Sequence, residues 1–459
     1  MPYDINETHD PNLKSWVESA NAPGTEFPIQ NLPFVQFESL ETFLADDGET
    51  RVPEHYSAGV RIGDHLLDLQ RCVEEGLFKD ELFDALGTPF LDSMESILDA
   101  DAEAWSMLRA GIVNILRKDG AVFRGNAGAK SKIILPIADC RLLPIFKKIP
   151  NYTDFYASIH HASTVGAMFR PDNALLPNYK WVPIGYHGRA SSIVPSGSTI
   201  TRPRGQTKAD DAPAPTFGPS KLLDYELEVG FFVGRGNELG TPIHIGEAED
   251  HILGLCLVND WSARDFQKWE YQPLGPFLAK NFATSVSPYL VTMEALAPFR
   301  VPAYPRPAGD PAPLPHLYSE RDQKLGGIDI TLEVFLASKE MRERGIAPIR
   351  LSRGSFKDMY WTIAQLLTHH ASNGCNMQPG DLLASGTISG PTPDSRGCLL
   401  ELTWDGPGKP RKPIELPTGE KRTFLEDGDE VIMRGYCERE GFRRIGFGEC
   451  RGIIAPSRA

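Results

Sequence analysis

The chain has 459 residues, with 47 Lys and Arg against 61 Asp and Glu, and a formal net charge of -14. This acidic balance repels nucleic acid and anionic membrane surfaces, so both are excluded as expected partners. The apolar share of 41% suffices for a packed core, and 42 Gly with 38 Pro indicate many turns and short strands rather than disorder.

Three regions are expected along the chain. Residues 1–26 are polar, and we expect them to be a loosely held extension. Residues 27–146 are expected to form a small first domain, and residues 147–459 a large second one. We place the boundary within the segment LLPIFKKIPNYTDF, because the sequence changes there to short β runs separated by Gly and Pro.

The first domain is predicted to begin with extended segments and then to become helical. The extended segments are FVQF and GVRIGDHLLDL. In the stretch that follows, apolar residues recur at spacings of three and four, and Leu108, Ile112 and Ile115 share one face of a predicted helix. This domain therefore combines a small sheet with helical additions.

The second domain is predicted to be dominated by β-strands. One clear helix is expected over residues 355–372, with Ser355 as its N-cap. The proline-rich stretch 298–316 is interpreted as a surface loop within the domain, because a β pattern resumes directly after it. The predicted strands lie in KWVPIGYHG, ELEVGFFVG, ILGLCLVND, IDITLEVFLA, GCLLELTW and DEVIMRGYC.

Several common enzyme motifs are absent or incomplete. The segment VGRGNELG resembles a dinucleotide fingerprint, but its glycine spacing is G-x-G-x-x-x-G and Pro242 stands where a helix should begin, which favours a turn. There is no G-x-S-x-G elbow and no H-E-x-x-H, so serine-hydrolase and zincin mechanisms lack support.

Cysteine usage and the chain ends favour a cytoplasmic protein. The seven cysteines are scattered and contain no Cys-x-x-Cys pair, which predicts reduced thiols rather than a disulfide frame or a zinc site. The start, MPYDINETHD, is polar and acidic, so we expect no signal or transit peptide. No apolar run approaches the roughly 18 residues of a membrane span, and the final Ser-Arg-Ala lacks the leucine of a peroxisomal address.

Four carboxylates are candidates for a metal site. Glu226 and Glu228 are two apart in a predicted strand and therefore share one face, while Asp260 ends a buried apolar run and Asp154 lies in NYTDFYASIHHAS. Gathered at one point, they would raise each other's pKa values, a penalty that a hard cation such as Mg²⁺ or Ca²⁺ removes. Spacing alone leaves open a solvated polar face, a turn at Asp260 and a helix N-cap at Asp154.

Long runs of the sequence resemble the fumarylacetoacetase family. They are FPIQNLPF, DFYASIHHASTVGAMFR, PIGYHGRASS, ELEVGFFVG, VNDWSARDFQKWEYQPLGPFLAKNFATS, LLASGTISGP and DGDEVIMRGYC. The resemblance spans residues 27 to about 455 and departs at the polar extension, the His160-His161 doublet and some loop lengths. It implies a mainly β fold with some α, in which a small SH3-like domain precedes a large mixed β-roll catalytic domain.

The resemblance also implies an activity. A family member hydrolyses a carbon–carbon bond of 4-fumarylacetoacetate, a diketo-diacid, to fumarate and acetoacetate in the final step of tyrosine and phenylalanine breakdown. It does so as a homodimer with bound Mg²⁺ and/or Ca²⁺. Other reactions in the wider superfamily are acylpyruvate hydrolysis and decarboxylation or isomerisation of a keto-diacid, and an inactive scaffold on this fold is the alternative from another class. The intact N-terminal domain and the pair His161 and Glu401 favour the first reaction, and no ligand carboxylate is missing.

By this resemblance, each candidate residue has an expected role. The metal site is expected to comprise Asp154, Glu226, Glu228 and Asp260, lined by Lys280 and Thr284. Substrate is expected to contact Tyr156, Arg170, Tyr186, Gln267, Tyr271 and Thr387. The catalytic groups are expected to be His161 as general base, Glu401 as its orienting carboxylate, and Arg264, Gln267 and Lys280 as stabilisers of the oxyanion. His161 rather than His160 is in register, because the nine-residue step to Arg170 is kept.

On the residues alone, most of these roles are not apparent. His161 reads as a structural histidine, Arg264 as a surface charge, Thr387 as a turn residue and Glu401 as an outward residue of a strand in LLELTW. Lys280 stands out independently, because it lies in the apolar run GPFLAKNF, where an unpaired ammonium group is costly.

Overall fold

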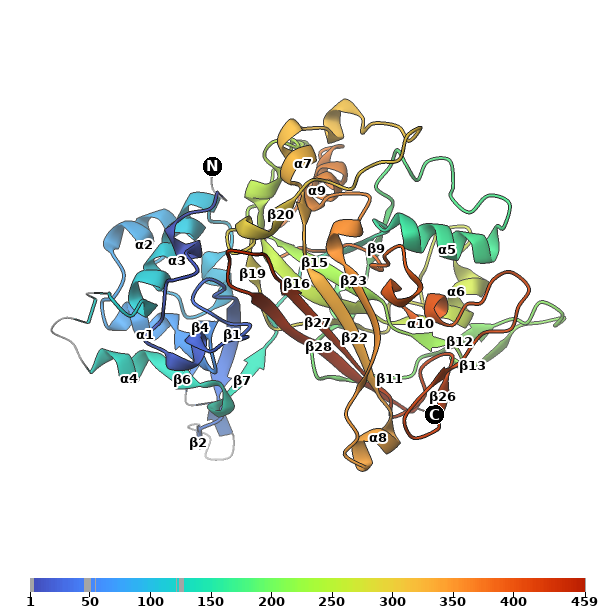
Figure 1. Cartoon of the computed structure of the whole chain (residues 1–459), viewed down its shortest axis with the longest axis horizontal. Helices are drawn as coiled ribbons and strands as arrows, with labels where there is room; N and C mark the ends of the chain where they lie inside the picture. The colour runs from blue at the N-terminus through green and yellow to red at the C-terminus, as the bar shows by residue number, and fades with distance from the viewer. Residues whose placement is uncertain (1–3, 45–50, 54, 121, 124–127, 459) are drawn as a thin grey trace.

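The computed structural model describes residues 4–44, 51–53, 55–120, 122–123 and 128–458. A small N-terminal unit lies beside a much larger unit that contains the two long sheets (Figure 1). This arrangement confirms the predicted class, a mainly β protein with some α in which a small domain precedes a large mixed one. Within the described ranges, no helix has the length and apolar character needed to cross a membrane.

The N-terminal unit is built on a five-stranded antiparallel sheet of order β6-β5-β4-β1-β7. Its strands are β1 (Phe34–Ser39), β4 (Tyr56–Ile62), β5 (His65–Asp68), β6 (Ile134–Pro136) and β7 (Cys140–Leu143), and β2 (Thr42–Leu44) pairs with β3 (Arg51–Pro53). Its helices are α1 (Leu69–Glu74), α2 (Asp80–Leu86), α3 (Ala102–Leu116) and α4 (Ala129–Ile133). The predicted helix through Leu108, Ile112 and Ile115 is confirmed as α3, with all three side chains buried.

The polar N-terminal segment is not loosely held, so that expectation is wrong for residues 4–26; residues 1–3 lie outside the described ranges. His9 is buried, and its Nε2 lies 2.8 Å from the carbonyl oxygen of Glu294 in the large unit. Trp16 Nε1 donates to the carbonyl oxygen of Ile115 at 2.8 Å. Polar side chains are held here by partners distant in the sequence, which composition cannot indicate.

Two large sheets make up the large unit. The first has the order β10-β18-β16-β15-β24-β8-β9, with β19 also pairing with β16, and the second has the order β11-β28-β27-β22-β23. The first contains β8 (Tyr152–Phe155), β9 (Gly185–Gly188), β10 (Ile193–Pro195), β15 (Leu227–Val233), β16 (Ile252–Asp260), β18 (Thr284–Val286), β19 (Val291–Thr292) and β24 (Leu382–Ala384). The second contains β11 (Thr199–Thr201), β22 (Thr331–Ala337), β23 (Ile349–Ser355), β27 (Glu430–Cys437) and β28 (Ile445–Ala455).

Short hairpins and helices complete this unit. The paired short strands are β12 (Arg204–Thr207) with β13 (Thr216–Pro219), β14 (Leu223–Asp224) with β17 (Ser262–Ala263), β20 (Arg300–Val301) with β21 (Gly327–Ile328), and β25 (Ile414–Glu415) with β26 (Lys421–Arg422). The helices are α5 (Ile159–Phe169), α6 (Arg264–Glu270), α7 (Glu320–Leu325), α8 (Lys339–Glu343), α9 (Ile363–Ala371) and α10 (Leu399–Leu402).

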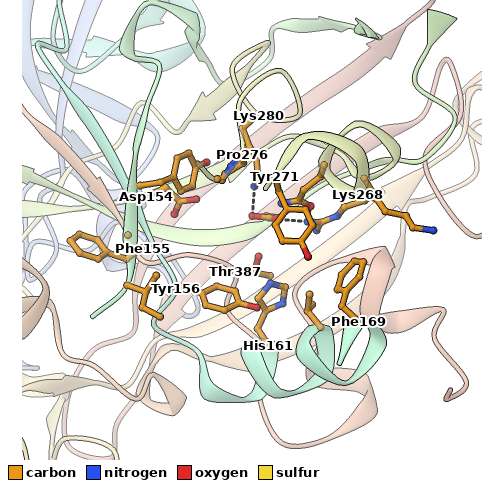
Figure 2. A pocket seen from close by; sticks show the side chains of 18 of the residues that line it. Asp154, Phe155, Tyr156, His161, Phe169, Lys268, Tyr271, Pro276, Lys280 and Thr387 are labelled. Atoms are coloured by element: carbon orange, nitrogen blue, oxygen red, sulfur yellow. Dashed lines mark hydrogen bonds and ion pairs between the residues drawn. The ribbon is translucent and has the colours of Figure 1, made fainter. Parts of the chain in front are cut away.

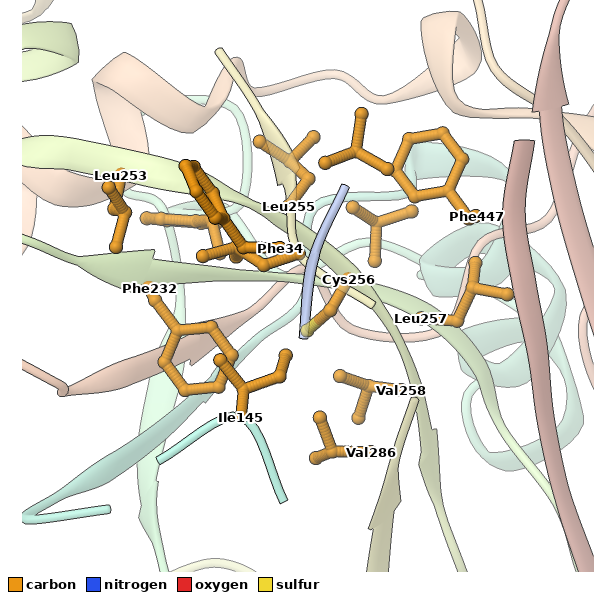
Figure 3. Packing of buried hydrophobic residues seen from close by; sticks show 14 of the residues in the cluster. Phe34, Ile145, Phe232, Leu253, Leu255, Cys256, Leu257, Val258, Val286 and Phe447 are labelled. Carbon is orange, nitrogen blue, oxygen red and sulfur yellow. The ribbon is translucent and has the colours of Figure 1, made fainter. Parts of the chain in front are cut away.

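The core lies where the two sheets and the N-terminal unit meet. Every residue of β16 is buried, and its Leu255 and Leu257 pack in the same layer as Phe447 of β28 (Figure 3). Phe146, after the small unit, packs against Phe232 of β15 with ring centroids 4.9 Å apart. Burial on both faces explains why β16 is a continuous apolar run rather than an alternating one.

Two predicted elements differ from the structure. The helix expected over 355–372 begins only at Ile363, where Thr362 and Gln365 form a capping box; Ser355 instead caps a short 3₁₀ turn. The segment LLELTW is not a strand, since its first residues form the one-turn helix α10. The N–H groups of Leu399 and Leu400 donate to the carboxylate of Asp224, a tertiary contact that overrides the local β pattern.

Candidate active site

The sheet order brings the four candidate carboxylates together. Strand β15 lies beside β16 and, one strand further on, β24 pairs with β8, which carries Asp154. The antiparallel register of β15 and β16 pairs Leu227 with Asn259, so Glu226 lies level with Asp260. Oxygen atoms of Asp154, Glu226, Glu228 and Asp260 lie within 4.8 Å of one another, and all four residues are buried. Glu226 and Glu228 are therefore not on a solvated face, and Asp154, which lies in strand β8, is not a helix N-cap.

Cations neutralise only part of this cluster. Lys280 Nζ lies 2.5 Å from Glu226 Oε2 and 2.7 Å from Asp260 Oδ2. Burial raises the pKa of Glu226, but Lys280 and Arg264 outweigh it and hold that pKa below its ordinary value. Asp260 also accepts hydrogen bonds from the hydroxyl groups of Thr284 at 2.6 Å and Tyr186 at 2.9 Å.

The other two carboxylates of the cluster are Asp154 and Glu228. Among the described residues, neither oxygen of Glu228 has a hydrogen-bond partner, nor does Asp154 Oδ1. Burial, followed by the neighbouring carboxylates, raises the pKa values of both Asp154 and Glu228 well above their ordinary range. Unpartnered buried carboxylate oxygens facing one another form a donor set that fits a divalent cation with a preference for oxygen ligands.

A histidine–carboxylate pair lies close to this cluster. Ser158 caps helix α5, because its Oγ accepts the N–H of His161 at 3.1 Å. His161 Nδ1 lies 2.6 Å from Glu401 Oε2, which also accepts from Ser389 Oγ at 2.6 Å and from Cys398 Sγ at 3.4 Å. Burial raises the pKa of Glu401, but His161 and Ser389 outweigh burial and hold that pKa below its ordinary value.

The two histidines of the doublet face different surroundings. His161 is buried and lines a pocket, whereas His160 is only half-buried and lies against Tyr304, with ring centroids 6.1 Å apart. Burial lowers the pKa of His160. The structure therefore brings His161, and not His160, to the cluster of candidate residues.

The pocket has a volume of ≈ 370 Å³ and opens beside helices α5 and α6. In Figure 2, His161 and Lys280 approach its interior from opposite sides, with Thr387 and Tyr271 between them. The predicted site residues that line it are Asp154, Tyr156, His161, Arg170, Tyr186, Glu226, Arg264, Gln267, Tyr271, Lys280 and Thr387. Of the remaining predicted residues, Asp260 and Thr284 line a neighbouring cavity that shares Tyr186 and Lys280 with this pocket, and Glu228 and Glu401 are buried.

Arg264 begins helix α6 and reaches the pocket fully charged. Its Nη1 donates to Glu226 Oε1 at 2.5 Å and to Gln267 Oε1 at 3.1 Å, while Nε donates to Asp224 Oδ2 at 3.0 Å. Burial lowers its pKa, but Glu226 and Asp224 outweigh burial and raise it well above the ordinary value. Its Nη2 has no partner among the described residues.

Sequence reasoning missed the residues that support this site. Ser158 and Ser389 are ordinary in sequence, and their contacts with the histidine–carboxylate pair arise only on folding. Asp224 had one available signal, because it continues the alternation of Glu226 and Glu228 toward the N-terminus in DYELE. Apolar wall residues such as Val165 were likewise not predicted.

A buried histidine–carboxylate pair, fixed cations and acidic oxygens suited to a divalent cation meet at one pocket. This combination defines the active site of an enzyme.

Comparisons with known proteins identify the kind of enzyme. The family described as fumarylacetoacetate (FAA) hydrolase C-terminal matches residues 151–454, and that described as fumarylacetoacetase N-terminal matches residues 30–144. The chain is 47% identical to a fumarylacetoacetase of Bos taurus (95% of this chain, 98% of the relative) and 46% to one of Oryza sativa (97% and 98%). A solved fumarylacetoacetate hydrolase from Exiguobacterium antarcticum is 18% identical, with a TM-score of 0.44, covering 93% of this chain and 100% of that one. The chain belongs to the fumarylacetoacetate hydrolase family.

Proposed function

We propose that this protein hydrolyses 4-fumarylacetoacetate to fumarate and acetoacetate, the final step of tyrosine and phenylalanine breakdown. Relatives named fumarylacetoacetase at 46–47% identity over nearly the whole chain support this activity. The observation that carries the proposal is the placement of His161, paired with Glu401, in the same pocket as Asp154, Glu226 and Lys280. A carbon–carbon hydrolase needs a base for water and a site for the departing carbanion within reach of one substrate.

A divalent cation is the expected cofactor, and we propose Mg²⁺ or Ca²⁺. The all-carboxylate donor set of Asp154, Glu226, Glu228 and Asp260 supports a hard cation over zinc, and Lys280 and Thr284 line the same site. When bound, such a cation polarises the diketone oxygens and favours departure of acetoacetate as its enolate.

His161 is proposed to act as the general base. Because Nδ1 faces Glu401, Nε2 is the nitrogen left to take a proton from water as its oxygen bonds to the fumaryl carbonyl carbon. Glu401 fixes the tautomer and stabilises the imidazolium. The carbon–carbon bond then breaks, and the imidazolium returns its proton to the carbon of the departing acetoacetate.

Cationic and amide donors are proposed to stabilise the tetrahedral oxyanion. Arg264 lines the pocket with an unpartnered Nη2, and Gln267 lies one helical turn further along α6. Lys280 adds a charge held in place by two carboxylates. Fixed donors of this kind stabilise developing negative charge without rearranging during the reaction. The remaining pocket residues, Tyr156, Arg170, Tyr186, Tyr271 and Thr387, are proposed to bind substrate.

The direct test of the activity follows loss of the ultraviolet absorbance of fumarylacetoacetate with the purified, Mg²⁺-loaded protein. We expect turnover, with fumarate and acetoacetate formed in equal amounts. An acylpyruvate serves as the comparison substrate. Faster turnover of the acylpyruvate would assign the protein to the related superfamily reaction, and no turnover of either would favour an inactive scaffold.

Arg170→Ala should weaken substrate binding. Arg170 lines the pocket at the end of α5, its Nε has no partner among the described residues, and its guanidinium matches a terminal carboxylate. Loss of a charge-assisted contact of about 1.5–3 kcal/mol corresponds to a fall of about ten- to a hundred-fold in kcat/KM.

The matched control for this variant is Lys268→Ala. Lys268 lines the same pocket but is exposed and paired with Asp210, so its removal changes the local charge equally without removing a buried contact. Steady-state kinetics of both variants with fumarylacetoacetate decide the point. Equal losses in the two variants would show that Arg170 acts only through the general field of the pocket.

We further propose a cytoplasmic homodimer. All seven cysteines are free, which is typical of a reducing compartment.

Large apolar side chains are exposed near the pocket on Phe169, Trp269, Leu274 and Phe277, and such a patch favours association with a second copy. Sedimentation equilibrium should give twice the chain mass, and a monomer at micromolar concentration would contradict the proposal.

A further inference from the structure

Asp224 is a buried carboxylate that the mechanism above does not use. It ends the short strand β14, is completely inaccessible to solvent, and accepts four hydrogen bonds. Oδ1 accepts from the backbone N–H groups of Leu399 at 2.8 Å and Tyr225 at 2.9 Å. Oδ2 accepts from the N–H of Leu400 and from Arg264 Nε, both at 3.0 Å.

These contacts join two parts of the site that lie far apart in the sequence. Leu399 and Leu400 are the first residues of α10, the single turn that carries Glu401. Arg264 begins α6 on the other side of the pocket. The Asp224 carboxylate therefore contacts both α10, the turn that carries Glu401, and Arg264, the side chain expected to stabilise the oxyanion.

We propose that Asp224 is a positioning residue that holds Glu401 and Arg264 at a fixed separation across the active site. The proposal rests on the function proposed above, since it assigns Asp224 to the support of that same reaction. Asp224 neither lines the pocket nor belongs to the carboxylate cluster, so it acts only through α10 and Arg264.

The physical basis is the number of acceptors that α10 requires. A helix of four residues has N–H groups at its start with no partner in the helix, and buried N–H groups need acceptors. Asp224 supplies them and so sets the position of Glu401 relative to His161. The same carboxylate holds Arg264 Nε, which directs Nη1 to Glu226 and leaves Nη2 available.

A substitution that keeps the side-chain volume tests whether Asp224 acts through its hydrogen bonds or only by filling space. In Asp224→Asn, only one oxygen remains as an acceptor. The amide N–H₂ group that replaces the other oxygen would face N–H donors and cannot accept their hydrogen bonds. Either α10 or Arg264 therefore loses its partner. We expect Asp224→Asn to lower kcat about a hundred-fold with KM changed less than about three-fold, because the loss falls on transition-state stabilisation.

The matched control is Asp429→Asn. Asp429 is also completely buried, and it accepts from Arg422 Nε at 2.8 Å, Arg422 Nη2 at 3.0 Å and the N–H of Glu426 at 2.8 Å. It does not line the pocket. This control should lose thermal stability comparably, with kcat within about two-fold of wild type. Equal kcat losses in the two variants at matched folding would overturn the proposal.

Asp224→Glu provides a second variant. It keeps the charge but displaces the carboxylate by one methylene, so a role in positioning predicts a lower kcat here as well. Double-mutant cycles with Glu401→Gln and with Arg264→Lys should each show that Asp224→Asn costs less in the variant background than in wild type. Wild-type kcat in either folded variant, or losses that multiply in both cycles, would overturn the proposal.

A spectroscopic measurement keeps this inference separate from the activity. The proton between His161 Nδ1 and Glu401 should give a downfield ¹H NMR signal, assigned by its absence in His161→Ala. The signal should shift or vanish in Asp224→Asn and persist in Asp429→Asn, whatever substrate the enzyme takes. A signal unchanged in Asp224→Asn would refute the positioning of Glu401, whereas an inactive wild type that shows these shifts would refute only the proposed reaction.

Discussion

His161→Ala should remove most turnover while leaving the binding of cation and substrate largely intact. A general base contributes on the order of 10²–10⁴-fold, so kcat should fall by that factor. The neighbouring histidine is the matched control, because His160 is half-buried, contacts Tyr304 and does not line the pocket. His160→Ala should therefore retain kcat within a few-fold. Steady-state kinetics on fumarylacetoacetate, with cation content verified, give the comparison.

The role of Glu401 follows from a double-mutant cycle on kcat. Because Glu401 lies 2.6 Å from His161 Nδ1, it should act through the imidazole, and His161→Ala with Glu401→Gln should be little worse than His161→Ala alone. If the two losses multiply, Glu401 works independently of His161, and the pair as proposed is refuted.

Removal of the divalent cation should abolish activity, and Asp260→Ala should do the same permanently. Asp260 belongs to the cluster, and its oxygens accept hydrogen bonds from Lys280, Thr284 and Tyr186. Without the cation, the negative charges of the buried carboxylates repel one another, and no Lewis acid is present to polarise the diketone. Exhaustive chelation should reduce kcat below detection, and Mg²⁺ or Ca²⁺ should restore it in wild type but not in Asp260→Ala.

Asp381→Ala is the control for this experiment. Asp381 is equally buried but belongs to neither the cluster nor the pocket, and it accepts hydrogen bonds from Asn151 and Gln378. It should keep its cation and its response to chelation. Elemental analysis and isothermal titration of Mg²⁺ report binding independently of turnover. Full activity in protein shown to be metal-free would contradict a role for the cation.

The fold class and the acidic residues were predictable because they depend on spacing within one element. The alternation in ELEVGFFVG places Glu226 and Glu228 on one face, and the apolar run ending at Asp260 is the buried strand β16. The periodicity around Leu108 likewise predicts helix α3. Local patterns of this kind persist in the folded protein because burial of one face selects them.

Other local patterns were overridden by contacts between elements. The start of the β-like run LLELTW forms α10 because Asp224 satisfies its first N–H groups, and the polar start of the chain is held by partners such as Glu294. Neither partner is near in the sequence. A prediction from propensity has no access to a hydrogen bond made across more than a hundred residues.

The sequence by itself determined which residues are available for chemistry: the acidic residues at strand positions, Lys280 in an apolar run, and a family resemblance that singles out His161 and Glu401. Only the tertiary structure decided that these groups meet. His161 and Glu401 are 240 residues apart, and Glu226 lies level with Asp260 through the register of β15 and β16. Register and long-range contacts depend on how whole elements pack, because a shift of one residue in a strand turns every side chain to the opposite face.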